Sequence, residues 1–501
     1  MCGISAVFGP YRNKYWFLRR SLSKIEHRGT RSFEIRLFDK GGLGANRLPI
    51  VDRAGGQQPM SNENHTVFSV LNGEIYNHNE LRKDLERRGH RFSSNCDTEI
   101  LTHLYEEYGS EMVKHIDSEI YAFIIYDSVK DRFYAARDRF GLKPLYYATD
   151  NKGNYFFASE LKQLVQFGFI HKVFTFPKGH YMKNGKLVRY HRPRYGNRIK
   201  DESEAKKRLK SILVDAVRKR VDTDLPVAVM LSGGVDSSMI MEIAARFHKD
   251  VTAFTLGKPG SPDYEAAVRF CKERGYKHRI IHPSVDYAKE FEDIIYHLEL
   301  YEAQVIRQSF AIDLLSKAIA REGYRIVLTG DAADEIFAGY NQFSCLDEKN
   351  INKGCMTMLD DLERGHNVRL DRMTMKHTLE ARSPFFDTSL VDYAMHIDGR
   401  LKIRREDHQI TTKYILRKVA EDFLPDYIFN RYKVAFSNGA GMNVGFNFRA
   451  QDGDVASDIL RGRRIKPVKD KRYGFVTKEE NLYFNIYKRF RFDKLHNNWK
   501  R

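Results

Sequence analysis

The pattern of apolar and polar positions divides the chain into two regions with different predicted secondary structure. Between residues 4 and 194, short runs rich in β-branched and aromatic residues predict strands at residues 67–71, 121–126, 132–136 and 145–148. Helices are predicted at residues 79–88 and 98–107, where leucine and isoleucine recur at helical spacing. Strands with interleaved helices are typical of a layered α+β unit.

A second pattern begins after residues 191–203. This segment is polar and basic and contains Pro and Gly, so we interpret it as a linker. An amphipathic helix follows, and then buried strand runs alternate with helices. The predicted strands are residues 227–231, 251–256, 279–282 and 325–328, and the predicted helices are residues 235–247, 265–274 and 309–321. This alternation predicts an α/β domain with a parallel sheet. We therefore expect two domains, residues 2–190 and residues 204–501.

Composition and charge narrow the classes of function. In 501 residues, of which 42% are hydrophobic, no apolar run approaches the roughly 18 residues that cross a bilayer. The five cysteines are scattered, and the first residues lack the features of a signal peptide. These features predict a cytoplasmic protein with no membrane association. A net charge of +18 suggests nucleic acid as a partner, but the sequence has no zinc-finger spacing or aromatic RNA-binding signature, so this role is not expected.

Cys2 follows the initiator methionine, so removal of Met1 would leave one residue with both a thiol and a free α-amine. An α-amine has a pKa of about 7.7–8.0 and can act as general base for the thiol. A cysteine at the second position is, by itself, equally consistent with an ordinary chain end. The motifs in the rest of the region decide between these two interpretations.

Six motifs occur along residues 2–190. They are MCGI at the N-terminus, HRG at 27–29, NRLPIVD at 46–52, LNGEIYNH at 71–78, CDTE at 96–99 and RDRFGLKPLYY at 137–147. In this order they resemble the class II glutamine amidotransferase domain, an N-terminal-nucleophile hydrolase in which two antiparallel sheets lie between helices. One departure is that Thr30 and Arg31 follow HRG, where the family often has Pro and Asp. This reverses a charge near the expected pocket and leaves the tuning of glutamine affinity open.

The resemblance implies a role for each residue of a glutaminase site. Cys2 is the expected nucleophile, and the Asn72 side chain and the Gly73 backbone N–H are expected to stabilise the oxyanion. Arg47 is expected to hold the α-carboxylate of glutamine, because a guanidinium binds a carboxylate with two hydrogen bonds. Two carboxylates are expected to receive the α-ammonium group. These two and the other implied pocket residues are Glu74, Asp97, Leu48, Pro49, Ile50 and Val51.

The segment LSGGVDSS at residues 231–238 lies between a predicted buried strand and a predicted helix. Consecutive glycines at a helix N-terminus expose backbone N–H groups that bind anions, although the Walker A spacing and its lysine are absent. The segment resembles the SGGxDS signature of ATP pyrophosphatases, which have an adenine nucleotide alpha hydrolase-like fold. This resemblance implies ATP as a substrate.

Five further motifs resemble those of glutamine-hydrolysing asparagine synthetases. They are FTLGKPGSPDYEAA at 254–267, IRQSF at 306–310, LTGDAADEIFAGY at 328–340, RLDRMTMKHTLEARSPFFD at 369–387 and RYKVAFSNGAG at 431–441. With the motifs of the first region, the resemblance covers about residues 2–445. The family's typical GEGxDE segment reads GDAADE here, so Asp331 stands in place of a glutamate.

In this second site the resemblance implies that Asp236 and Asp334 hold Mg²⁺, a hard ion that prefers oxygen ligands. Asp331 is implied to be a catalytic acidic group, shorter than the usual glutamate by one methylene. Lys433 is implied to stabilise charge on the α-phosphate. The residues expected to hold pyrophosphate are Ser232, Gly233, Gly234, Ser237 and Ser238. Those expected to hold adenosine are Leu231, Leu256, Thr329 and Gly330.

The resemblance implies a two-site synthesis. Glutamine would be hydrolysed to glutamate and ammonia through a thioester on Cys2, and ATP would adenylate aspartate to β-aspartyl-AMP with release of pyrophosphate. Ammonia would pass inside the protein and convert the adenylate to asparagine and AMP. A homodimer is also implied. Two alternatives stay open: an amidotransferase of the same family acting on another carboxylate (a sugar acid, peptide or antibiotic precursor), and a basic nucleic-acid-binding protein with a vestigial enzyme core.

Overall fold

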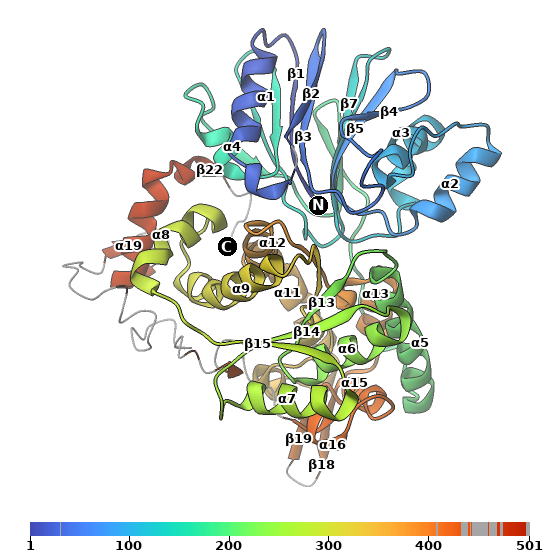
Figure 1. The fold of residues 1–501 in the computed structure, drawn as a ribbon, viewed down its shortest axis with the longest axis vertical. Coiled ribbons are helices and arrows are strands. Elements are labelled where there is room, and N and C mark those ends of the chain that lie inside the picture. The colour runs from blue at the N-terminus through green and yellow to red at the C-terminus, as the bar shows by residue number, and fades with distance from the viewer. Residues whose placement is uncertain are drawn as a thin grey trace.

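The computed structural model describes residues 1–30, 32–406, 409–431, 439–440, 442, 459, 468–470 and 474–496. Within them, two regions lie one above the other (Figure 1). The blue-to-teal region holds the strands of two sheets, and the region from green onwards holds a parallel sheet among helices. Both predicted fold classes are confirmed: an α+β N-terminal-nucleophile hydrolase architecture followed by an α/β domain.

The N-terminal region is built on two facing sheets. One has the strand order β2-β3-β1-β9-β8-β10-β22, and the other has the order β12-β11-β7-β6-β5-β4. Neighbouring strands pair antiparallel, except that β10 and β22 are parallel. The strands are β1 (Cys2–Phe8), β2 (Glu34–Phe38), β3 (Gly41–Arg47), β4 (Met60–Ser61), β5 (Val67–Gly73), β6 (Tyr121–Asp127), β7 (Arg132–Arg137), β8 (Tyr146–Thr149), β9 (Tyr155–Ala158), β10 (Val173–Thr175), β11 (His180–Lys183), β12 (Lys186–Arg189) and β22 (Leu495–His496).

Side chains alternate between the two faces of each strand, so each sheet packs against the other sheet on one face and against helices on its other face. The region therefore has four layers. Phe8 and Leu43 of the first sheet share a core with Phe68 and Ile124 of the second. The opposite faces of the strands pack against helices, on the first sheet through one apolar cluster and on the second through another. The helices are α1 (Lys14–Ser23) and α4 (Leu161–Val165) on the first sheet, and α2 (His78–Arg87) and α3 (Asp97–Tyr108) on the second. The sequence therefore forms a helix–sheet–sheet–helix sandwich.

The second region is a five-stranded parallel sheet of order β15-β14-β13-β16-β17. Its strands are β13 (Val227–Met230), β14 (Val251–Leu256), β15 (Lys277–Ile281), β16 (Ile326–Leu328) and β17 (Glu380–Arg382). The helices around it are α5 (Glu202–Arg220), α6 (Val235–Phe247), α7 (Pro262–Arg274), α8 (Tyr287–Leu298), α9 (Ala303–Arg321), α10 (Ala333–Ile336), α11 (Glu348–Asp361), α12 (His366–Met375), α13 (Thr388–His396), α14 (Gly399–Lys402), α15 (Tyr414–Ala420) and α16 (Asp426–Phe429). Because β13 and β16 are neighbours, the loops at their carboxyl ends lie together, which is where open α/β sheets bind ligands.

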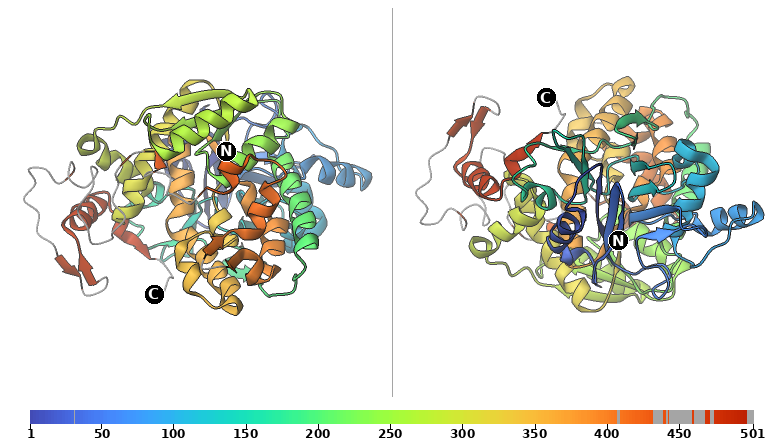
Figure 2. Two further views of the ribbon diagram at one scale, coloured as in Figure 1. Left: turned by 90° about the horizontal axis from the view of Figure 1, so that it is seen from below. Right: turned by 90° about the horizontal axis from the view of Figure 1, so that it is seen from above.

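Strands β18 (Ile403–Glu406) and β19 (Gln409–Thr412) form a two-stranded antiparallel sheet in the second region. The last described elements are β20 (Val468–Asp470), β21 (Gly474–Val476) and α19 (Lys478–Arg489), followed by β22, which joins the first sheet of the N-terminal region. The red elements lie at one flank of the molecule in both views of Figure 2. There α19 contacts α8, and Leu495 of β22 pairs with Val173 of the first sheet. None of the described helices is long and apolar enough to cross a membrane.

Candidate active sites

The first site lies where the ends of the two sheets of the N-terminal region meet. Cys2 begins β1 and is directly paired with Arg47 at the end of β3, and Asn72 comes near the end of β5 in the facing sheet. The backbone N–H of Cys2 donates a hydrogen bond to Asn72 Oδ1 at 3.3 Å. Burial raises the pKa of the Cys2 thiol, and the N-terminal ammonium and Arg47 offset part of that rise. The thiol therefore needs a nearby base to react.

Two potential hydrogen-bond donors lie near Cys2. The Asn72 side-chain nitrogen Nδ2 is buried and has no hydrogen-bond partner among the described residues. Gly73 has a φ of +149°, and a Cβ there would lie 1.9 Å from the carbonyl oxygen of Ile120, so only glycine fits. The sequence-predicted pair Asn72 and Gly73 thus lies beside Cys2.

Other predicted glutamine-binding residues line the same small cavity. Arg47 is held by hydrogen bonds to the carbonyl oxygens of Val51 (2.8 Å) and Asp52 (2.7 Å). Asp97 accepts a hydrogen bond from the backbone N–H of Ile75 at 3.0 Å. The predicted residues that line the cavity are Cys2, Arg47, Leu48, Ile50, Val51, Gly73, Glu74 and Asp97. Pro49 and Asn72 are not among the lining residues.

Glu74 has a partner outside the first region. Its carboxylate lies 2.9 Å from the Arg382 guanidinium of β17, and burial raises its pKa to about 8. It lines the cavity and also joins the two regions. Three further lining residues, Gln58, Cys96 and Thr98, were not predicted, and Gln58 Nε2 lies 3.5 Å from the Cys2 sulfur. Gln58 belongs to none of the sequence motifs, so the sequence does not indicate this contact.

Met1 occupies the space beside the thiol. Its side chain is buried, and its ammonium group lies 3.1 Å from Glu380 Oε2. The cavity that remains beside Cys2 is about 20 Å³, roughly the space of one water molecule. A glutamine side chain does not fit there while Met1 is attached.

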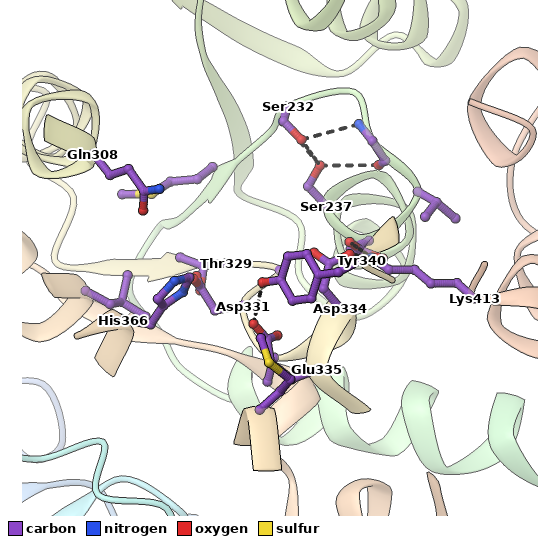
Figure 3. A pocket seen from close by; sticks show the side chains of 18 of the residues that line it. Ser232, Ser237, Gln308, Thr329, Asp331, Asp334, Glu335, Tyr340, His366 and Lys413 are labelled. Carbon is purple, nitrogen blue, oxygen red and sulfur yellow. Dashed lines mark hydrogen bonds and ion pairs between the residues drawn. The ribbon is translucent and has the colours of Figure 1, made fainter. Parts of the chain in front are cut away.

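The second site is a cavity of about 570 Å³ at the carboxyl ends of β13 and β16 (Figure 3). The loop after β13 is held in shape by its own hydroxyl groups. Ser237 Oγ accepts a hydrogen bond from the Ser232 backbone N–H at 3.2 Å, and Ser232 Oγ accepts one from the Gly234 N–H at 3.3 Å. Gly233 has a φ of +67°, and a Cβ there would lie 2.7 Å from the backbone nitrogen of Ala267. The loop can therefore turn against α7 only with glycine at this position.

Three charged groups meet inside this cavity. Lys413 Nζ lies 2.6 Å from Asp236 Oδ2 in the first turn of α6 and 2.6 Å from Asp334 Oδ1 in α10. Asp236 Oδ1 is buried and has no hydrogen-bond partner among the described residues. The two predicted metal ligands thus lie on either side of one ammonium group. Lys413 was not predicted, because its sequence context, TTKY, matches no motif.

Asp331 lies across the cavity from the serine loop, near Glu335 and Tyr340 (Figure 3). Its backbone carbonyl accepts a hydrogen bond from Ser383 Oγ at 2.6 Å. Arg369 lines the same cavity, and burial lowers the pKa of its guanidinium, a shift that the charge of Asp331 opposes. The cavity therefore contains a carboxylate and a guanidinium that influence each other electrostatically.

The remaining predicted residues divide into three groups. Ser232, Gly234, Asp236, Ser237, Thr329, Gly330, Asp331 and Asp334 line the cavity. Leu231, Gly233, Ser238 and Leu256 lie in the same loops or strand ends but not among its lining residues. Lys433 and Arg31 lie outside the described residues.

Comparison with known proteins adds to this geometry. A family described as "Glutamine amidotransferase domain" matches residues 1–187, and one described as "Asparagine synthase" matches residues 208–352 and 345–466. An asparagine synthetase [glutamine-hydrolyzing] from Sandersonia aurantiaca is 34% identical over 528 residues, covering 100% of this chain and 98% of that protein. Asparagine synthetase [glutamine-hydrolyzing] 2 from Oryza sativa subsp. japonica is 33% identical, covering 98% of this chain and 85% of that protein. Asparagine synthetase [glutamine-hydrolyzing] 3 from Arabidopsis thaliana is 34% identical, covering 88% of this chain and 79% of that protein.

A two-sheet sandwich with cysteine at the start of its first strand, joined to a parallel sheet with a serine–glycine loop, and the two matched families define an ATP-using glutamine amidotransferase. The matches cover 88–100% of this chain at 33–34% sequence identity, and this narrows the class of protein further. The chain belongs to the family of glutamine-hydrolysing asparagine synthetases.

Proposed function

We propose that this chain makes asparagine from aspartate, glutamine, ATP and water, with glutamate, AMP and pyrophosphate as the other products. The observation that carries the proposal is the presence of two sites in one chain. Cys2 lies beside Asn72, whose amide nitrogen has no hydrogen-bond partner among the described residues, and a serine–glycine loop and two carboxylates line a larger cavity. The first arrangement suits acyl transfer from an amide, and the second suits a nucleotide phosphate.

In the first site, the α-amine of Cys2 acts as general base once Met1 has been removed. It takes the thiol proton, and the sulfur attacks the amide carbon of glutamine. Asn72 Nδ2 and the Gly73 N–H stabilise the oxyanion that forms. The protonated amine returns its proton to the leaving nitrogen, so ammonia departs and a thioester remains. Water then hydrolyses the thioester to glutamate and restores the thiol.

In the second site, the loop of residues 231–238 holds the pyrophosphate part of ATP, and Thr329 and Gly330 hold the adenosine. Asp236 and Asp334 would hold Mg²⁺, and Asp236 Oδ1, which has no partner in the described part of the chain, supports this fit. When bound, Mg²⁺ neutralises charge on phosphate oxygens. Lys413 already contributes one positive charge between the two carboxylates. Lys433 is proposed to stabilise the α-phosphate, and Asp331 to act as the acidic group beside the acceptor carboxylate.

The arrangement of the whole chain completes the proposal. Residues 2–190 form the glutaminase domain, residues 191–203 the linker and residues 204–501 the synthetase domain, and the two family matches end and begin at residues 187 and 208. Met1 lies buried where the first site meets Glu380 of the second region, so we propose that its removal opens space for ammonia to leave the first site. We further propose that the protein acts in the cytoplasm as a homodimer.

Replacing Cys2 tests the proposal. Cys2→Ala should abolish asparagine formation from glutamine and leave formation from added ammonia within about twofold of the parent, because the thiol takes no part in adenylation. Asparagine and pyrophosphate are measured with and without aspartate. Cys345→Ala, at an exposed cysteine, is the matched control and should retain both activities. Loss of both activities in Cys2→Ala alone would contradict the two-site proposal, and pyrophosphate release that ignores aspartate would contradict the acceptor.

A further inference from the structure

Four side chains from three segments converge on the outer side of α3, away from both proposed active sites. Glu63 comes from the turn between β4 and β5, and His90 from the connection between α2 and α3. His103 and Glu106 belong to α3 itself, three residues apart and therefore on one face of the helix. One ligand atom from each lies within 4.8 Å of all the others.

The separations between these atoms match the edges of a tetrahedron around a metal ion. Zinc binds imidazole nitrogen and carboxylate oxygen at about 2.0–2.2 Å, which places neighbouring tetrahedral ligands roughly 3.3–3.6 Å apart. Nδ1 of His90 and Nδ1 of His103 are 3.2 Å apart. Glu63 Oε1 lies 3.5 Å from Nδ1 of His90, and the other oxygen of Glu63, Oε2, lies 3.3 Å from Nδ1 of His103. Glu106 Oε2 lies 3.9 Å and 3.6 Å from the same two nitrogens. Small rotations of both carboxylates would place one oxygen of each at a corner of the tetrahedron.

The surrounding groups hold the two histidines and one carboxylate in this orientation. His90 Nε2 lies 3.0 Å from a carboxylate oxygen of Glu107, as expected for a histidine that binds metal through its other nitrogen. Asn62 Nδ2 donates to Glu106 at 2.8 Å, which leaves the second carboxylate oxygen facing the histidines. His103 is fully buried, and its Nε2 has no hydrogen-bond partner among the described residues; Glu99 lies 3.9 Å from it.

We propose that Glu63, His90, His103 and Glu106 form a structural site for a divalent transition-metal ion, with Zn²⁺ as the best fit. Two imidazoles disfavour Mg²⁺ and Ca²⁺, which prefer oxygen ligands. Four protein ligands leave no open position for chemistry, which is typical of structural zinc sites. The ion would tie the β4–β5 turn and the α2–α3 connection to α3. Asp97 of the glutamine pocket lies six residues before His103, about 9 Å along the helix, so the ion would stabilise the pocket wall without touching substrate.

The test compares matched histidine variants of the full-length protein after chelation and dialysis. His90→Asn removes one ligand in the connection between α2 and α3, outside the helices and strands. His65→Asn, in the same turn as Glu63 and bonded to Ser61, is the control. We expect the parent and His65→Asn to bind one more Zn²⁺ per chain than His90→Asn, by mass spectrometry and titration calorimetry. Zn²⁺ should raise the Tm of the first two and not of the third.

Cobalt provides a readout of geometry. Co²⁺ should give the intense visible bands of tetrahedral coordination in the parent and in His65→Asn, and these bands should be absent in His90→Asn. Glu106→Gln is the second ligand variant and should behave like His90→Asn, so misfolding of one variant does not decide the result. Equal Zn²⁺ content in parent and ligand variants, or a Co²⁺ spectrum that the ligand variants leave unchanged, would overturn the proposal. The four groups would then be a hydrogen-bonded cluster alone.

Discussion

At the residue scale, the chain departs from its family beside Asp331, the acidic group that we place next to the acceptor carboxylate. Ala332, which follows Asp331, has φ +76° and ψ −12°, a left-handed conformation that glycine adopts without steric cost. The family's GEGxDE segment has glycine at this position. Ala332 precedes the short helix α10, whose first residues bring Asp334 to Lys413. An alanine is therefore strained at a place that positions a proposed metal ligand.

Substitution by glycine measures that strain. Both Ala332 and Ala333 are buried, but only Ala332 has a positive φ. Each change to glycine removes one buried methyl group and adds chain entropy to the unfolded state, so these costs cancel in the comparison. Ala332→Gly should therefore be less destabilising than Ala333→Gly by about 1–2 kcal/mol, the cost of a left-handed alanine. Urea unfolding of the two variants checks this, and equal losses would show that the position is unstrained.

At the scale of elements, the helices and strands that could be predicted from apolar periodicity are those that burial of apolar side chains stabilises. The predicted strand at residues 251–256 and the predicted helix at residues 235–247 coincide with β14 and α6. Strand β17 could not be predicted, because its sequence is Glu-Ala-Arg. Both of its charged residues are buried, and their partners come from distant segments: Glu380 meets the Met1 ammonium, and Arg382 meets Glu74. Patterns within one segment contain no information about such partners.

The same reasoning separates the parts of the sites that could be predicted from those that could not. Residues in contiguous motifs, such as Cys2 and Asn72, could be placed in one candidate site because their motifs resemble those of a known family. Lys413 could not, since a single lysine becomes significant only when the fold places it between Asp236 and Asp334. Gln58 is a similar case. Long-range contacts therefore account for most of what sequence analysis missed.

Helix α12 links the synthetase region to the loop that supports Cys2. Arg28, from the HRG motif, donates to Asp371 of α12 at 2.8 and 3.1 Å and to the Cys2 carbonyl at 3.1 Å. Arg28 also pairs with Glu160 at 2.8 Å, and all these charged groups are buried. Two motifs 343 residues apart in the chain thus form one ion-pair network.

Breaking the Arg28–Asp371 ion pair should lower the free energy of unfolding and should reduce the fraction of released ammonia that is used to form asparagine. Asp371→Asn leaves a buried guanidinium with one carboxylate fewer, so we expect a loss of about 3 kcal/mol, near the lower end for breaking a buried ion pair. Asp360→Asn breaks the exposed pair with Lys178 (3.0 Å), also between the regions, and should cost less than about 1 kcal/mol. Calorimetry measures stability, and the ratio of ammonia released to asparagine formed measures coupling. Equal effects of the two variants would contradict a special role for the buried pair.

At the scale of the whole molecule, the two regions are joined by more than the segment between them. Backbone contacts fasten that segment to the synthetase region, with the N–H of Gly196 donating to the Met395 carbonyl at 3.0 Å. At its start, the His191 ring packs against Phe140, which in turn contacts Phe386 of the synthetase region. His191 Nε2 is buried without a hydrogen-bond partner among the described residues. This histidine is placed to make the junction of the regions sensitive to pH.

The direction of that sensitivity follows from the pKa of His191. Burial, together with the nearby charges of Arg139 and Lys178, lowers it to about 4, whereas an unfolded histidine has a pKa of about 6.5. Between these values the unfolded chain binds the proton more strongly, so the neutral imidazole's contribution is complete above pH 6.5 and is lost as the pH falls toward 4. The slope is at most about 1.4 kcal/mol per pH unit. His191→Phe keeps a ring against Phe140 and cannot titrate, so its stability should fall less steeply than that of the parent between pH 6.5 and 4.5 in thermal unfolding. Parallel curves for the two proteins over that range would show that the junction does not respond to this proton.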